Sequence, residues 1–289
     1  MKKHKIRKDY IKKIVVNLLR YFFLISLSYI VLYQITFMLS QAFKPMDQLY
    51  DPSVVWLPKK FTVNNLKLAW ETMNYLRSFA TTLLIPVGSG LLQIITCSIT
   101  AYGLARFKFK GSKMIFTLVL FTILIPPQMI IVPTYLNYSH LDFFGVLSVL
   151  GRLFGKDIRP NVLDTGLTFY LPAIFGVGLR SGLFIFIYRQ FFIKMPTELE
   201  EAAYIDGAGP LRTFLSIIIP SSGVVMLTVT IFSVIWHYND YFLSAMYLTE
   251  RKTLAVALET IANTSSTQNI AADYTRVLNM SGSLLFIIP

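Results

Sequence analysis

Long apolar stretches alternate with polar segments along almost the whole chain. Because an α-helix rises about 1.5 Å per residue, about 20 consecutive apolar residues are needed to cross the hydrocarbon core of a bilayer. Five stretches approach or exceed this length, and one of them is interrupted by a single charge, Arg180. The pattern predicts an all-α polytopic membrane protein with helices over residues 20–42, 78–105, 114–139, 167–192 and 211–238.

The end of the chain carries the start of a sixth hydrophobic stretch. It runs from Val277 to Pro289 and has only 13 residues, too few to cross a bilayer. We therefore expect a six-transmembrane-helix fold whose last helix is truncated. The chain is predicted to be one transmembrane domain, residues 1–289, made of a basic cytoplasmic tail (1–20), outer loops (44–77 and 240–276), a cytoplasmic loop (195–210) and the spans.

The charges support this topology. The chain is 54% hydrophobic and only 15% charged, yet its net charge is +12. With the N-terminus in the cytoplasm, the inner segments 1–20, 106–113 and 189–212 hold 15 Lys and Arg in 52 residues, whereas the outer segments hold 11 in 94. This asymmetry follows the positive-inside rule. The basic excess is therefore explained by topology, and we expect no nucleic-acid partner.

A charged segment between the fourth and fifth spans interrupts the apolar pattern on the cytoplasmic side. Thr197 and Glu200 have the spacing of a capping box, and acidic residues in the first turn suit the dipole of a helix. The spacing predicts a short helix over 198–205, broken by Gly207 and followed by Pro210 in the first turn of the next helix. Small side chains on this helix would let another protein approach closely.

Further positions in and after this segment match a known motif. They are Glu201, Ala202, Ala203, Gly207, Ile217 and Pro220. With this spacing between two spans, the segment resembles the EAA loop of the permeases of binding-protein-dependent ABC importers. The stretches 101–107, 125–128 and 189–192 are similar to the carbohydrate permeases of the maltose type. The resemblance implies a multi-pass subunit of the bacterial plasma (inner) membrane.

The same resemblance implies a function and a set of partners. The chain would form half of the path for a sugar or oligosaccharide through the lipid bilayer, beside a second homologous permease. Two cytoplasmic ABC ATPase subunits would supply the energy, and an extracellular solute-binding protein would deliver the sugar. The implied ATPase-coupling residues are Glu198, Glu201, Ala202, Ala203, Asp206, Gly207 and Ala208. Because ATP hydrolysis would take place on a separate chain, no catalytic residue, cofactor or metal ion is expected here.

Two regions are candidates for the solute path. Pro126 and Pro127 predict a break within the third span, since each proline removes a backbone donor. The outer end of the fifth span carries aromatic and amide groups of the kind a saccharide contacts. The candidate residues are Pro127, Gln128, Asn137, Trp236, Tyr238 and Asn239. A packing kink and an interfacial aromatic belt are the alternatives, and for Arg180 snorkelling or pairing at the outer end is preferred over solute contact.

Three rival functions differ in their source of energy or chemistry. An ion-coupled secondary carrier usually keeps Asp, Glu or His within its spans, and the predicted spans contain no carboxylate. A membrane-embedded enzyme would need clustered acid, base or nucleophilic groups. An ABC permease for a non-sugar solute fits the same sequence. No phosphate-binding loop is present, so the energy must come from another chain.

Overall fold

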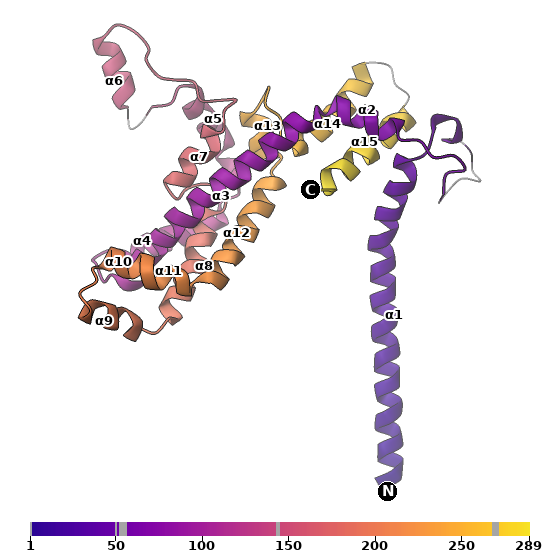
Figure 1. Cartoon of the computed structure of the whole chain (residues 1–289), viewed down its shortest axis with the longest axis horizontal. Coiled ribbons are helices and arrows are strands. Elements are labelled where there is room, and N and C mark those ends of the chain that lie inside the picture. Colours follow the sequence, from indigo (N-terminus) through magenta and orange to yellow (C-terminus); the bar gives the residue numbers. More distant parts are fainter. Residues whose placement is uncertain (1, 50, 52–56, 143–144, 268–271) are drawn as a thin grey trace. The chain divides into compact units, whose positions relative to one another are not determined.

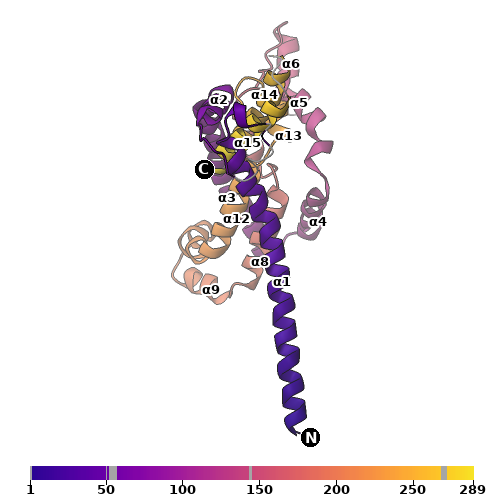
Figure 2. The same cartoon turned by 90° about the vertical axis from the view of Figure 1, so that its right-hand side faces the viewer.

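The computed structural model describes all residues except 1, 50, 52–56, 143–144 and 268–271, and Figures 1 and 2 show it from two sides. In the described residues all regular secondary structure is helical, which confirms the predicted fold class. The chain divides into two compact units. We call residues 1–75 with 257–289 the terminal unit, and residues 76–256 the central unit.

The terminal unit packs its two ends together around a buried amide. It contains α1 (Lys2–Ala42), a 3-10 turn at Met46–Gln48, α2 (Asn64–Thr72) and α15 (Ala272–Ile287). The Nδ2 of Asn65 donates to the backbone oxygens of Ala42 (3.1 Å) and Lys44 (2.8 Å), and its Oδ1 accepts from the hydroxyl of Tyr274 at 3.3 Å. This network joins the end of α1 and the start of α2 to the early part of α15.

Two helices cross the boundary between the units, α3 (Tyr75–Arg106) and α14 (Leu254–Thr267). The other helices of the central unit are α4 (Ser112–Leu124), α5 (Ile131–Ser139), α6 (Val146–Leu153), α7 (Leu167–Ile174), α8 (Ser181–Lys194), α9 (Glu198–Ile205), α10 (Pro210–Thr213), α11 (Ile219–Ser221), α12 (Gly223–Tyr238) and α13 (Phe242–Tyr247). Short turns of other kinds lie at Pro127–Met129 (3-10) and Phe214–Ile218 (π).

The core of the central unit lies between α3, α8 and α12, which run side by side (Figures 1 and 2). The side chains of Phe184, Tyr188 and Phe192 on α8 are fully buried in it. Each large aromatic side chain buries roughly 150–250 Å². These rings therefore fix α8 firmly against its two neighbours.

Three of the predicted spans are broken. The third ends at Leu124 and resumes at Ile131, so the break predicted from the two prolines is confirmed. The fourth was predicted as one helix over 167–192, but α7 ends at Ile174 and α8 starts at Ser181. Its break includes Gly176 at φ 68° and Arg180 at φ 62°, both in the left-handed region, which no α-helix can continue through.

The fifth predicted span, 211–238, is bent rather than straight. The segment Pro210–Ser221 meets α12 at an angle of 78°. A π-turn and Pro220 lie just before the bend, and both disturb the regular hydrogen-bond ladder of a helix. Because the sequence is apolar on both sides of the bend, the pattern predicted one continuous helix over 211–238.

The breaks explain how few helices are individually long enough to cross a bilayer. In the described part of the chain these are Lys12–Ala42 within α1 and Tyr75–Arg106, with one further span if the bent pair is counted as one. The last helix begins at Ala272, earlier than the predicted start at Val277, and ends at Ile287.

Candidate functional site

The predicted cytoplasmic loop folds as a short helix, α9, closed by a tight turn (Figure 1). The N–H of Ala208 donates to the oxygen of Ala203 at 2.9 Å, and the N–H of Gly207 donates to the oxygen of Tyr204 at 3.1 Å. Gly207 has φ 79°. This pair of bonds with a left-handed glycine is the Schellman motif, which satisfies carbonyls at the end of a helix. The predicted break at Gly207 and the predicted position of Pro210 in the first turn of α10 are both confirmed.

The start of α9 differs from the prediction. No side-chain hydrogen bond caps its N-terminus, so the capping box of Thr197 and Glu200 is wrong. The carboxylate of Glu200 instead accepts from Nε of Arg106 at 2.6 Å, and it is therefore drawn away from the N-cap. The guanidinium also donates through Nη2 to the oxygen of Met195 at 2.8 Å. One arginine at the end of α3 thus holds both the entry to α9 and its first turn.

The Arg106–Glu200 pair is largely hidden from solvent. The two side chains are 11% and 8% exposed, respectively. Arg106 was not among the predicted coupling residues. A basic residue at the inner end of a span looks like a topology signal, and its partner lies 94 positions away, so the sequence pattern offered no sign of the pairing.

The predicted coupling residues divide between two faces of α9. Ala203 is buried against the unit, and Ala208 is half-buried. The others are exposed: Glu198, Glu201, Ala202, Asp206 and Gly207. Ile205 is 86% exposed, and together with Glu198, Glu201 and Ala202 it has the i, i+3, i+4, i+7 spacing of one helical face. We call these four residues the outer face of α9.

A second basic residue joins the ends of α3 and α8. The Nε of Arg189 donates to the oxygen of Leu104 at 3.2 Å, and its guanidinium lies 3.9 Å from the ring centroid of Phe116. The contact with Phe116 is a cation–π interaction. Two arginines therefore connect four helices of the central unit, α3, α4, α8 and α9.

The candidate solute-path residues lie in two places. Gln128 and Asn137 are exposed near the break of the third span and on α5, respectively, and Pro127 starts the turn between α4 and α5. Asn239 is exposed and donates to the oxygen of Ile235. Tyr238 is half-buried at the end of α12.

The sixth candidate, Trp236, is half-buried among other rings. Its centroid lies 5.7 Å from that of Phe184 and 5.4 Å from that of Phe232. The guanidinium of Arg180 lies 5.5 Å from the same ring. The structure therefore supplies the partner of Arg180 that the sequence did not indicate.

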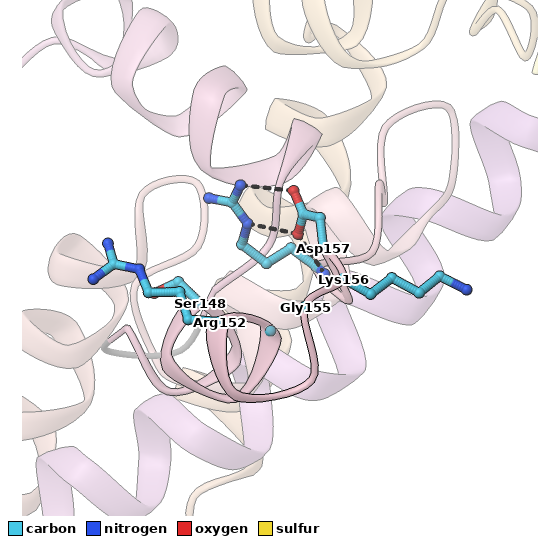
Figure 3. Close-up of a pocket in the computed structure, with 7 residues that line it drawn as sticks. Ser148, Arg152, Gly155, Lys156 and Asp157 are labelled. Carbon is cyan, nitrogen blue, oxygen red and sulfur yellow. Dashed lines mark hydrogen bonds and ion pairs between the residues drawn. The ribbon is translucent and has the colours of Figure 1, made fainter.

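The segment between α5 and α7 is held at its two ends by backbone hydrogen bonds and contains a small basic hollow. The N–H of Leu141 donates to the oxygen of Pro160, and the N–H of Val162 donates to the oxygen of Tyr138, both at 2.9 Å. The hollow beyond this base is lined by Ser148, Gly151, Arg152, Gly155, Lys156, Asp157 and Arg159 (Figure 3).

Within this hollow the guanidinium of Arg159 donates two hydrogen bonds, of 2.9 and 2.7 Å, to the carboxylate of Asp157 (Figure 3). These bonds from the guanidinium hold the pKa of the Asp157 carboxyl well below its usual range. Because both groups are in contact with water, the pair contributes little to stability. Lys156 points away from the pair (Figure 3), so the surface stays basic.

Comparison with known proteins places these features in a family. Residues 93–288 match the family described as the binding-protein-dependent transport system inner membrane component. The chain is 32% identical to the melibiose/raffinose/stachyose import permease MelC of Bacillus subtilis, over 72% of this chain and 69% of the relative. It is 30% identical to the probable starch degradation products permease AmyC of Thermoanaerobacterium thermosulfurigenes, over 73% and 68%.

A solved structure has the same fold. It is a bacterial ABC transporter involved in the import of the acidic polysaccharide alginate, and one of its chains superposes with a TM-score of 0.70 at 20% identity, covering 93% of this chain and 91% of the other. The shared arrangement of helices supports the permease fold.

Proposed function

Because the chain belongs to the family of inner membrane components of binding-protein-dependent transport systems, we propose that it is a permease subunit of an ABC importer for a sugar or oligosaccharide. It is a multi-pass membrane protein and a transport subunit, and ATP hydrolysis takes place on a partner chain. The relatives named for melibiose, raffinose, stachyose and starch products support a carbohydrate as the solute.

The outer face of α9 is the observation that carries the proposal. It presents two carboxylates and an apolar tip, Ile205, to the surroundings, while its other side is fixed by Arg106. An acidic helix end fits a groove on a cytoplasmic ATPase that offers cationic groups. Closure of the ATPase around ATP then moves α9 as a rigid body and passes the movement to α3 through the buried ion pair.

The other partners follow from the family's mode of action. A second permease completes the path, two ATPases bind the two coupling helices, and a solute-binding protein outside delivers the sugar. The N-terminus lies in the cytoplasm of a bacterial cell, and the protein lies in its plasma membrane. The seven coupling residues keep their proposed role, with Ala203 and Ala208 supporting the helix from within.

The test is sugar-stimulated ATP hydrolysis by the reconstituted importer, containing this chain, its partner permease, the ATPase and the loaded binding protein. The Ala202→Pro variant should abolish the stimulation, since proline inside a helix costs about 3 kcal/mol or more. The Ser283→Pro variant is the control, because it breaks a different helix, α15. In this variant the ATPase should remain bound to the permease.

Two results would contradict the proposal. Uptake by this chain alone, driven by a proton or sodium gradient, would favour an ion-coupled carrier. Stimulation by a non-sugar solute alone would favour a permease for another substrate class.

A further inference from the structure

The break in the fourth predicted span contains an arginine. Arg180 immediately precedes α8, which runs 14 residues to Lys194. At 1.5 Å per residue, Arg180 lies about 21 Å along α8 from Lys194, which is less than the thickness of a hydrocarbon core, about 30 Å. A charge within a span is costly if it faces lipid, and such residues usually face a wet cavity or a partner.

The backbone of Arg180 is strained as well. Its φ of 62° lies in the left-handed region, where glycine is the default residue. A side chain other than glycine, asparagine or aspartate in this region costs of order 1 kcal/mol or more and is concentrated at functional sites. An arginine therefore occupies a position where glycine would suit the backbone better.

The surroundings hold the break in a defined shape. Gln93 on α3 is fully buried, and its Nε2 donates to the oxygen of Leu179 at 2.8 Å and to the hydroxyl of Ser181 at 3.0 Å. Its Oε1 accepts from the hydroxyl of Ser233 on α12 at 2.8 Å. The residues on both sides of Arg180 are thus fixed by one amide that connects α3, α8 and α12.

The guanidinium of Arg180 lies beside an aromatic ring and has no counter-ion in the described part of the chain. It is exposed and lies 5.5 Å from the centroid of the half-buried Trp236, and none of the ion pairs among the described residues includes it. A guanidinium binds a carboxylate through two parallel hydrogen bonds. The N–H edges of the guanidinium are not used by its contact with the ring.

We propose that Arg180 and Trp236 form a solute subsite for a sugar that carries a carboxylate, such as a uronic acid unit. Arg180 pairs with the carboxylate of the sugar, and the ring of Trp236, whose centroid lies 5.5 Å from the guanidinium, supports the guanidinium. This inference rests on the proposed function and makes it more specific, because it chooses acidic over neutral sugars as the substrate class.

The experiment measures binding to the assembled importer in lipid nanodiscs, without the solute-binding protein. Isothermal titration calorimetry compares tetragalacturonate with maltotetraose, a neutral sugar of the same length. The unchanged importer should bind tetragalacturonate at least about tenfold more tightly, since a charge-assisted pair supplies at least this factor. Arg180→Gly should abolish this preference, and because glycine suits the backbone at this position, misfolding does not explain the loss.

Two further variants separate the subsite from a general charge effect. Arg180→Lys should keep part of the preference, because an ammonium retains the charge without the planar fork. Arg251→Gln removes one exposed positive charge elsewhere in the same unit and should leave the preference unchanged.

Equal binding of the two sugars, binding of neither, or a preference that survives Arg180→Gly would overturn the inference. An importer whose ATPase is stimulated only by neutral sugars would also overturn it while leaving the proposed function intact. Absence of stimulation by any sugar, in contrast, would contradict the proposed function itself.

Discussion

Removing Arg106 should destabilise the central unit, because Glu200 then loses its ion-pair partner. In the intact pair the side chain of Glu200 is 8% exposed, and in the Arg106→Ala variant its carboxylate loses its partner at 2.6 Å. Breaking a buried ion pair by removing one partner costs about 3–5 kcal/mol. The oxygen of Met195 also loses a donor. We expect the free energy of unfolding to fall by about this amount.

The chain contains its own reporter for this measurement. Cys97 is its only cysteine and is fully buried in the core of the central unit. A thiol-reactive dye should therefore label the purified chain in detergent only as the core opens. At about 2–4 °C for each kcal/mol, the midpoint of labelling should fall by roughly 10 °C.

Two variants make the result specific to the pair. Glu201→Gln changes an exposed carboxylate one position along the chain and should shift stability by about 0.5 kcal/mol or less. Arg106→Met combined with Glu200→Leu removes both charges and should recover most of the loss, because no isolated buried charge remains. If Arg106→Ala and Glu201→Gln lower the midpoint equally, the buried pair does not hold α9 in place.

Two further predictions concern the coupling turn and the topology. Gly207→Val should abolish stimulation of the ATPase, because valine is an outlier at φ 79°, whereas Gly207→Asn should keep much of it; equal activity of the two would exclude a role for this turn. A cysteine at Lys156 should react in intact cells with a membrane-impermeant maleimide while one at Thr197 should not, in a chain with Cys97 replaced by alanine; the opposite pattern would invert the proposed orientation.

The apolar pattern was sufficient to predict the class of fold but not the shape of each span. Pro126 and Pro127 predicted the break after Leu124, because proline acts locally on the backbone. The break before Arg180 depends on a buried amide that lies 86 to 88 positions away. Hydropathy averages cannot represent such a contact, so the fourth span was predicted as continuous.

The candidate coupling site shows the same division between local and distant causes. The glycine turn at Gly207 could be predicted because its conformation follows from its own chemistry. The role of Glu200 could not, since two local signals favoured an N-terminal cap. A guanidinium at 2.6 Å offers the carboxylate a full opposite charge, which a backbone N–H does not, and the distant partner therefore prevails.

The two adjacent glutamates of α9 consequently carry different tasks. Glu200 is buried and held by Arg106, whereas Glu201 is exposed on the outer face. A helix that must transmit movement needs a firm attachment on one side and a free surface on the other. Neighbouring positions in a helix are 100° apart, so two successive carboxylates can point to these two sides from a single turn. If α9 couples to an ATPase, Glu201 sets how tightly the partner binds, and Glu200 sets how much of the partner's movement reaches α3.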